Sequence, residues 1–152
     1  MNRRKFLDKS YLGLSTILVA PETITSLGKI DSSSVTNNSK TYAISTWNVS
    51  EANMIAGKAL EGGLSAIEAA VNGVAYEESN LLNTTVGMGG APDRDGVVSL
   101  DACVMNHTGD CGAVLAVENI THVAALAKEV MEKTPHVILA GKGARQFALE
   151  QG

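Results

Sequence analysis

The side chains that most often carry catalysis or bind metals are few in this chain, and they lie far apart. The three histidines, His107, His122 and His136, fall in different predicted elements and lack the spacing of a metal site. The two cysteines, Cys103 and Cys111, are too few for a disulfide framework or a zinc cluster. They flank a predicted hairpin loop and could face each other across it, although two separately packed thiols are the commoner arrangement. These residues indicate no metal and no cofactor.

The most informative segment covers residues 86–105, with the sequence VGMGGAPDRDGVVSLDACVM. Three closely spaced glycines begin it, Gly87, Gly89 and Gly90. Glycine allows a positive φ, or a close backbone approach that a Cβ would block. Pro92 then fixes its own φ, and residues 93–96 are typical of a turn before a strand. The segment therefore predicts a tight glycine-rich turn that leads into a buried strand.

This segment and three others resemble, in the same order, the N-terminal part of the glycosylasparaginases, a family of N-terminal-nucleophile hydrolases. The matching segments are residues 45–48, 86–105, 131–141 and 147–152. Matches extend from about residue 41 to residue 152 and so cover the whole predicted domain. The resemblance implies an α+β fold, the αββα sandwich of that family. Residues 41–152 would form only its first half.

The resemblance also implies where the catalytic group lies. In this family a threonine at the N-terminus of a second chain attacks the substrate amide, and its own α-amine acts as the base. That threonine is released when the precursor cleaves itself at a His-Asp-Thr-type motif, and the present sequence contains no such motif. We therefore expect these 152 residues to be the N-terminal, or α-chain, fragment of the enzyme. The catalytic residue would lie downstream of it.

Two residues in the chain are candidates for the site. Thr85 is a weak candidate for the nucleophile, because a valine and a glycine follow it as in the family's nucleophile motif. Its surroundings fit better a position where relatives carry a serine near the active site, so we predict that Thr85 binds substrate as a lining residue. Trp47 lies in the Ser-Thr-Trp-Asn match and is also predicted to bind substrate. The alternative is that Trp47 is a core residue, since a large aromatic ring on a strand is usually buried in the hydrophobic core.

The implied activity is that of an amidohydrolase that cleaves the amide between N-acetylglucosamine and asparagine. An L-asparaginase or isoaspartyl peptidase of the same fold is the alternative within the class. A catalytically inactive fragment or partner chain is the alternative outside it. The Trp47 segment and the turn at residues 92–96 favour the glycosylated substrate. The implied partner is a β-chain from the same precursor, in a heterotetramer of two α- and two β-chains, and no cofactor is implied.

Composition is that of an ordinary globular domain. Hydrophobic residues make up 45% of the chain and charged residues 18%. The formal net charge is −4, and the body of the chain has no basic cluster, so neither nucleic acid nor an anionic membrane is expected as a partner.

The first forty residues differ from the rest in composition. Residues 1–28 are predicted to be a twin-arginine-type signal peptide, because Arg3 and Arg4 precede Phe6 and a short apolar run. The alternative is a disordered tail. Residues 29–40 are rich in serine and asparagine and are predicted to be a disordered spacer. We therefore expect an exported, periplasmic protein whose domain begins near residue 41.

Hydrophobic periodicity and turn residues predict eight elements in the domain. Strands are predicted at residues 41–47, 97–105, 111–117 and 136–140, and helices at residues 50–60, 66–78, 119–133 and 141–151. Ser65 and Glu68 have the spacing of a capping box for the second helix. Since few strands accompany these helices, we also expect an unpaired sheet edge and an uncovered apolar face.

Overall fold

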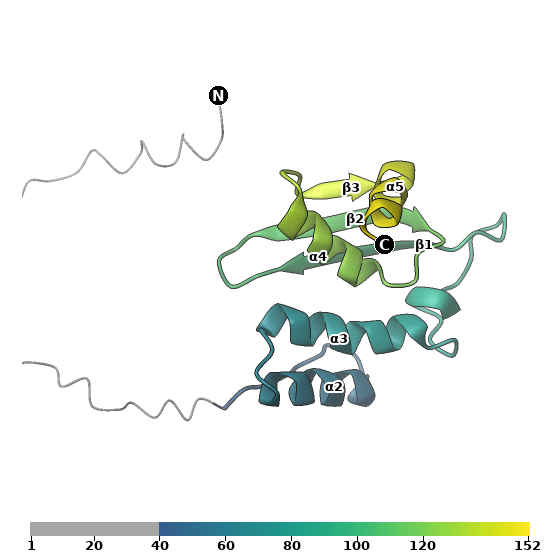
Figure 1. Cartoon of the computed structure of the whole chain (residues 1–152). Helices are drawn as coiled ribbons and strands as arrows, with labels where there is room; N and C mark the ends of the chain where they lie inside the picture. Colours follow the sequence, from purple (N-terminus) through teal and green to yellow (C-terminus); the bar gives the residue numbers. More distant parts are fainter. Residues whose placement is uncertain (1–39) are drawn as a thin grey trace, which may run out of the picture. The chain divides into compact units, whose positions relative to one another are not determined.

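The computed structural model describes residues 40–152 (Figure 1). Its elements, in chain order, are α2 (Ser50–Glu61), α3 (Ala66–Ser79), the 3₁₀ turn η1 (Gly87–Gly89), β1 (Ser99–Met105), β2 (Cys111–Glu118), α4 (Val123–Lys133), β3 (Ile138–Ala140) and α5 (Gly141–Gln151). The predicted signal peptide at residues 1–28, and all of the predicted spacer except residue 40, lie outside the described residues.

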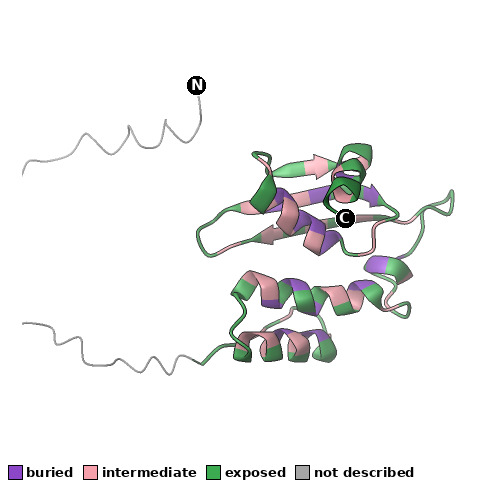
Figure 2. Cartoon of the chain, in the orientation of Figure 1, coloured by how far each residue is buried: buried purple, intermediate pink, exposed green. Residues whose placement is uncertain are grey.

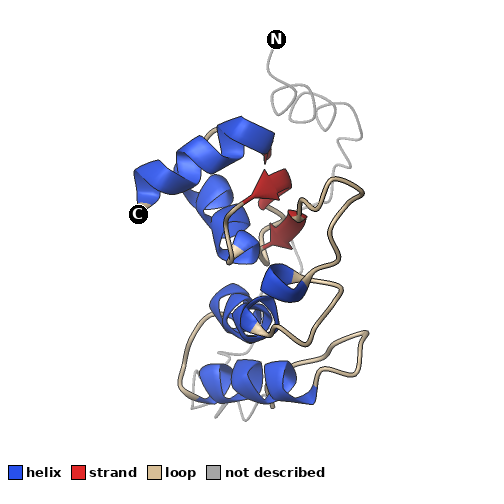
Figure 3. Ribbon diagram, turned by 90° about the vertical axis from the view of Figure 1, so that its right-hand side faces the viewer, coloured by secondary structure: helices blue, strands red, loops and turns tan. Residues whose placement is uncertain are grey.

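The sheet in the described region has three strands in the order β1-β2-β3. β1 and β2 form an antiparallel hairpin, and β3 pairs in parallel with β2 after the chain has passed through α4. Figure 3 shows α4 and α5 on one side of these strands, while α2 and α3 form a separate pair of helices. The described residues therefore form an α+β arrangement, as predicted.

The main core lies between β2 and the two helices that cover it. Val114 and Val117 on β2 are fully buried, and so are Ala127 and Val130 on α4 and Ala144 on α5. Figure 2 shows this burial concentrated along β2 and the inner side of α4. Burial of apolar surface of this kind is the dominant stabilising term in folding. The core thus fixes the position of the β1–β2 hairpin relative to α4 and α5.

A β-bulge interrupts the hairpin. The register between β1 and β2 shifts between Leu100 and Ala102. Asp101 Oδ1 accepts a hydrogen bond from the Ala116 backbone N–H at 2.6 Å, and Ala116 has a positive φ of 50°. Strict alternation would place Val114 and Val117 on opposite faces, because they are three residues apart. The bulge allows both to point into the same core.

The helix pair has its own packing. Gly73 on α3 lies so close to α2 that an added Cβ would come within 2.6 Å of the Ala52 carbonyl oxygen. The predicted capping box is confirmed: the Ser65 hydroxyl accepts from the Glu68 N–H, and the Glu68 carboxylate accepts from the Ser65 N–H. The cap satisfies backbone groups that the first turn of a helix leaves unpaired.

Residues 41–47 were predicted as a strand, and that prediction is wrong for this structure. The segment is irregular and bends at residues 46–47. A strand requires a neighbour to satisfy its backbone groups, and no described strand lies beside this segment. Its large side chains Tyr42 and Ile44 are exposed. The other elements agree with prediction apart from three boundaries: the strands predicted from residues 97 and 136 begin at Ser99 and Ile138, and the helix predicted from residue 119 begins at Val123.

The two cysteines do not face each other. Cys103 pairs with Ala113 and Cys111 pairs with Met105, and both thiols are free. Cys103 is exposed, so it is not the packed core thiol expected from sequence. Within residues 40–152, no helix has the length and apolar character required to cross a membrane.

Candidate functional site

The two residues that sequence analysis singled out line the same cavity. This cavity, called here the Trp47 cavity, has a volume of about 1150 Å³. It is bounded by residues 42–49 and 82–86 and by parts of α2 and α3, and both Trp47 and Thr85 belong to its lining. The irregular segment before α2 and the loop after α3 are thus brought together, although they are distant in sequence.

The Trp47 side chain is 74% exposed, so in this structure it is not a core aromatic. Its backbone is nevertheless held in a tight turn. The Trp47 carbonyl oxygen accepts hydrogen bonds from the Val49 N–H at 2.9 Å and from the Ser45 hydroxyl at 2.7 Å. An indole presented to the cavity on a fixed backbone is suited to contact with a ligand, because a large rigid ring supplies contact area with little loss of conformational freedom.

Thr85 is held by the side chain of Asn83. Its hydroxyl donates to Asn83 Oδ1 at 2.7 Å, and its backbone N–H donates to the same oxygen at 3.0 Å. A nucleophilic threonine of the N-terminal type needs a free α-amine as base. The Thr85 nitrogen is an internal amide, and the partner of its hydroxyl is a neutral carboxamide. The geometry therefore suits Thr85 as a lining residue and not as a nucleophile.

The glycine-rich turn packs tightly against the end of α3. Gly87 has a positive φ of 62° and follows the extended Val86. A Cβ at position 87 would collide with the backbone of Glu78. The sequence pattern predicts a positive φ or a close backbone approach for glycines in this segment, and Gly87 has both. This turn fixes the path of the loop that carries Thr85.

Glu78 is the residue that sequence analysis missed. It lies in the last turn of α3 and is 2% exposed. Its Oε1 accepts a hydrogen bond from the Ala124 N–H at 2.9 Å, and its Oε2 lies 3.3 Å from His122 Nδ1. The carboxylate thus meets the N-terminus of α4, where the helix dipole favours negative charge. The sequence does contain one indication that Glu78 is buried, because position 78 follows Val71 and Val74 at helical spacing.

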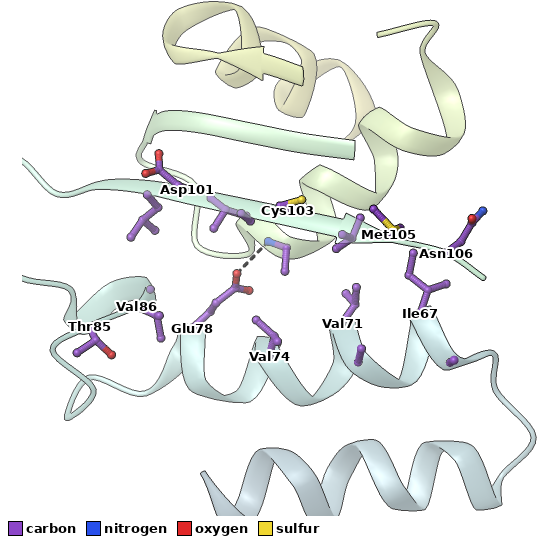
Figure 4. A pocket seen from close by; sticks show the side chains of 18 of the residues that line it. Ile67, Val71, Val74, Glu78, Thr85, Val86, Asp101, Cys103, Met105 and Asn106 are labelled. Atoms are coloured by element: carbon purple, nitrogen blue, oxygen red, sulfur yellow. Dashed lines mark hydrogen bonds between the residues drawn. The ribbon is translucent and has the colours of Figure 1, made fainter. Parts of the chain in front are cut away.

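A second cavity lies between β1 and α3 and is called here the β1–α3 cavity (Figure 4). Its volume is about 660 Å³. Ile67, Val71 and Val74 project from α3 toward β1, and Glu78 lies at the C-terminal end of the same row of side chains (Figure 4). Val74 is 42% exposed although it projects into this cavity from α3. β1 pairs only with β2 among the described strands, so its other edge is open.

Charged groups near the helices form local pairs. Lys128 and Glu132 on α4 are joined by a hydrogen bond of 2.9 Å, and this contact raises the pKa of Lys128. The hydrogen bond from the Ser65 side chain lowers the pKa of Glu68, with a smaller contribution from Lys128. These pairs stabilise helix ends and surfaces. In the region described, no cluster of three or more histidine, cysteine, aspartate or glutamate side chains could hold a metal ion.

The described residues thus define an α+β protein in which the larger of these two cavities is lined by an exposed tryptophan and a hydroxyl-bearing loop. A family model described as asparaginase matches residues 23–152. The chain belongs to that asparaginase family, which confirms the family inferred from the motifs.

Individual relatives agree with this assignment. The chain is 42% identical over 152 residues to N(4)-(Beta-N-acetylglucosaminyl)-L-asparaginase of Elizabethkingia miricola, a match covering 99% of this chain and 44% of that protein. It is 38% identical over 110 residues to the mouse protein of the same name, covering 72% of this chain and 32% of the relative. It is 42% identical over 96 residues to isoaspartyl peptidase of Salmonella typhimurium, a match covering 62% of this chain and 30% of that protein. The chain therefore spans less than half the length of these relatives.

Proposed function

We propose that this chain forms the Trp47 side of the substrate pocket in an amidohydrolase that cleaves the amide between N-acetylglucosamine and asparagine. The observation that carries the proposal is the exposed Trp47 indole on the lining of a large cavity that Thr85 also lines. The name of the Elizabethkingia relative, which matches 99% of this chain, supports the same substrate. In this proposal Trp47 and Thr85 contact the substrate, and neither breaks a bond.

The reaction follows from the resemblance to N-terminal-nucleophile hydrolases. A threonine hydroxyl from outside residues 1–152 adds to the side-chain amide carbon of the substrate, and the α-amine of that threonine accepts the hydroxyl proton. The carbon–nitrogen bond then breaks, and the proton passes to the leaving glycosylamine. Water cleaves the resulting ester, which releases aspartate and restores the hydroxyl. The α-amine would become free by self-cleavage of a precursor.

The complete fold in this proposal is the αββα sandwich, with residues 41–152 as its first half. Two features support it. The edge of β1 is open, and the β1–α3 cavity separates that edge from the apolar residues of α3. An added strand needs an unpaired edge for its backbone hydrogen bonds and an apolar surface for its side chains, and both are found here. A β-chain would supply such strands, within a heterotetramer of two α- and two β-chains.

An L-asparaginase or isoaspartyl peptidase is the second candidate, because the Salmonella relative carries the latter name. A catalytically inactive partner chain is the third. The three differ in what they require of Trp47. A glycosylated substrate places a sugar ring next to the amide, and an exposed aromatic surface is suited to cover it. The two smaller substrates lack that ring.

The experiment is to produce this chain together with the segment of the Elizabethkingia relative that follows the matched residues. N-acetylglucosaminyl-asparagine, asparagine and an isoaspartyl dipeptide are compared as substrates. We expect preference for the glycosylated compound, and we expect Trp47→Ala to lower kcat/KM for it about tenfold or more while changing asparagine hydrolysis less. Leu82→Ala is the matched control, because Leu82 lines the same cavity and is also exposed.

Two results would reject the proposal. Preference for asparagine or the dipeptide would favour the second candidate. No hydrolysis by a folded, co-purified complex would favour an inactive partner chain.

We also propose that the protein is exported to the periplasm by residues 1–28. The support is the Arg3-Arg4 pair with its following apolar run. A reporter fused to this segment should reach the periplasm of a bacterium with a twin-arginine system. Changing both arginines to lysine should prevent this, and unchanged export of the double variant would reject the twin-arginine route.

A further inference from the structure

Trp47 is held by its backbone and not by burial of its neighbours. The large side chains of its segment are mostly exposed, with Tyr42 73%, Ile44 88% and Trp47 itself 74% exposed. Apolar burial is therefore too small to fix this segment against α2. The residues of the turn are instead joined by hydrogen bonds, and one side chain of α2 is linked to them.

That side chain is Asn53. Its Nδ2 donates to Ser45 Oγ at 2.9 Å, and the Ser45 hydroxyl donates in turn to the Trp47 carbonyl oxygen at 2.7 Å. Ser45 has one hydroxyl proton, and Trp47 receives it, so Ser45 can only accept from Asn53. The Asn53 backbone N–H also donates to the Val49 carbonyl oxygen at 3.1 Å. That bond is the first backbone hydrogen bond of α2, so the Asn53 side chain itself holds the turn through Ser45.

We propose that Asn53 is a positioning residue that fixes the Trp47 turn to α2 and so orients the indole at the cavity. The proposal rests on the proposed function, in which Trp47 contacts the substrate. Asparagine is a poor helix former because its side chain competes for backbone groups, and here the side chain is used outside the helix. The chain of bonds from α2 through Ser45 to Trp47 explains its presence in the first turn.

The direction of these bonds allows a near-isosteric test. Asn53→Asp keeps the shape of the side chain and removes the donor, so the Ser45 hydroxyl is drawn toward the carboxylate and away from Trp47. The new charge lies in the first turn of α2, where the helix dipole favours it. We therefore expect opposite effects in one variant, with a more stable helix and a looser turn. If Asn53 acted only on the stability of α2, the helix and the turn would both become more ordered or both become less ordered.

The measurement uses the full chain, in which Trp47 is the single tryptophan. Time-resolved fluorescence anisotropy reports the motion of the indole, and hydrogen exchange of the Val49 amide reports the turn. We expect Asn53→Asp and Ser45→Ala each to accelerate Val49 exchange about fivefold and to increase indole motion. The double variant should resemble either single variant, because the two bonds act in series. Ser45→Thr, which keeps the hydroxyl, should behave as wild type.

The control is Asn72→Asp, the same chemical change on an exposed position of α3. It should leave both readouts unchanged. Far-UV circular dichroism checks that each variant keeps its helices, and Ser45→Ala carries the test if Asn53→Asp does not. Additive effects in the double variant, or a Val49 amide that exchanges freely in the wild type, would overturn the proposal.

These readouts need no substrate, so the two proposals can fail separately. A loosened turn in Asn53→Asp, together with normal hydrolysis by Trp47→Ala in the co-produced complex, would confirm the positioning and reject the pocket role. An unchanged turn in Asn53→Asp, together with loss of activity in Trp47→Ala, would confirm the pocket role of Trp47 and reject the positioning role of Asn53.

Discussion

At the scale of single residues, the side chains that fix the loops of this protein are polar and local. Asn83 holds Thr85, Asp101 holds the bulge, and Glu78 holds the start of α4. Each accepts a backbone N–H that would otherwise lack a partner within the fold. Among these three residues only Glu78 is buried, so its removal should lower the free energy of unfolding the most.

We expect Glu78→Ala to lower the free energy of unfolding by about 2 kcal/mol, because the buried Ala124 N–H would lose its acceptor. Glu78→Gln keeps an acceptor oxygen and should cost less than half as much. Urea denaturation monitored by circular dichroism provides the measurement, with the exposed Glu61→Ala as control. A Glu78→Ala variant as stable as the control would mean that the contact with α4 contributes nothing.

Sequence patterns anticipated many of these residues for physical reasons. Gly87 was identifiable because few other residues tolerate its φ, and Ser65 with Glu68 because the capping box has a fixed spacing. Glu78 was missed because a glutamate at the end of a helix is usually solvated, and only tertiary packing reveals its partner. The exposed position of Trp47 also depends on tertiary structure, since a tryptophan on a predicted strand is equally typical of a core.

At the scale of elements, local signals predicted the four described helices and the β1–β2 hairpin. The segment at residues 41–47 had the alternation of a strand and is irregular, because pairing depends on a neighbour that periodicity does not encode. The bulge at Asp101 was likewise not predicted, since it depends on which residues of β2 must enter the core.

The cap of α3 gives a pH-dependent prediction. The hydrogen bond from Ser65 lowers the pKa of Glu68, so this carboxylate adds stability above its unfolded pKa and loses it as the pH falls through the folded pKa. We expect Ser65→Ala to raise the Glu68 pKa toward its ordinary value and to weaken the acid dependence of stability. NMR titration of the side-chain carboxyl carbon measures the pKa, and urea denaturation at several pH values measures the stability.

The same titration includes an internal control. The pKa of Glu51 is lowered by its hydrogen bond from Ser50, on a different helix, and should stay lowered in Ser65→Ala. An unchanged Glu68 titration in that variant would show that the hydroxyl is not the cause of the shift.

At the scale of the whole molecule, the described residues expose apolar surface next to an open strand edge. If the proposed β-chain buried about 400 Å² of it, the gain would be about 10 kcal/mol, comparable with the whole stability of a domain. We therefore expect the co-produced complex to melt at a higher temperature and more cooperatively than this chain alone. Calorimetry of the two samples tests this, and equal melting would contradict the half-sandwich proposal.

The bulge in the β1–β2 hairpin has a further consequence for how the protein avoids self-association. An open edge strand is a template for pairing with an identical strand, which is the first step toward aggregates. The extra residue of the bulge lies in β2, and a bulge increases the local twist of the strand pair, so two copies of β1 would not align along their full length. The bulge that keeps Val117 in the core therefore also makes the open edge a poor surface for pairing with a second copy.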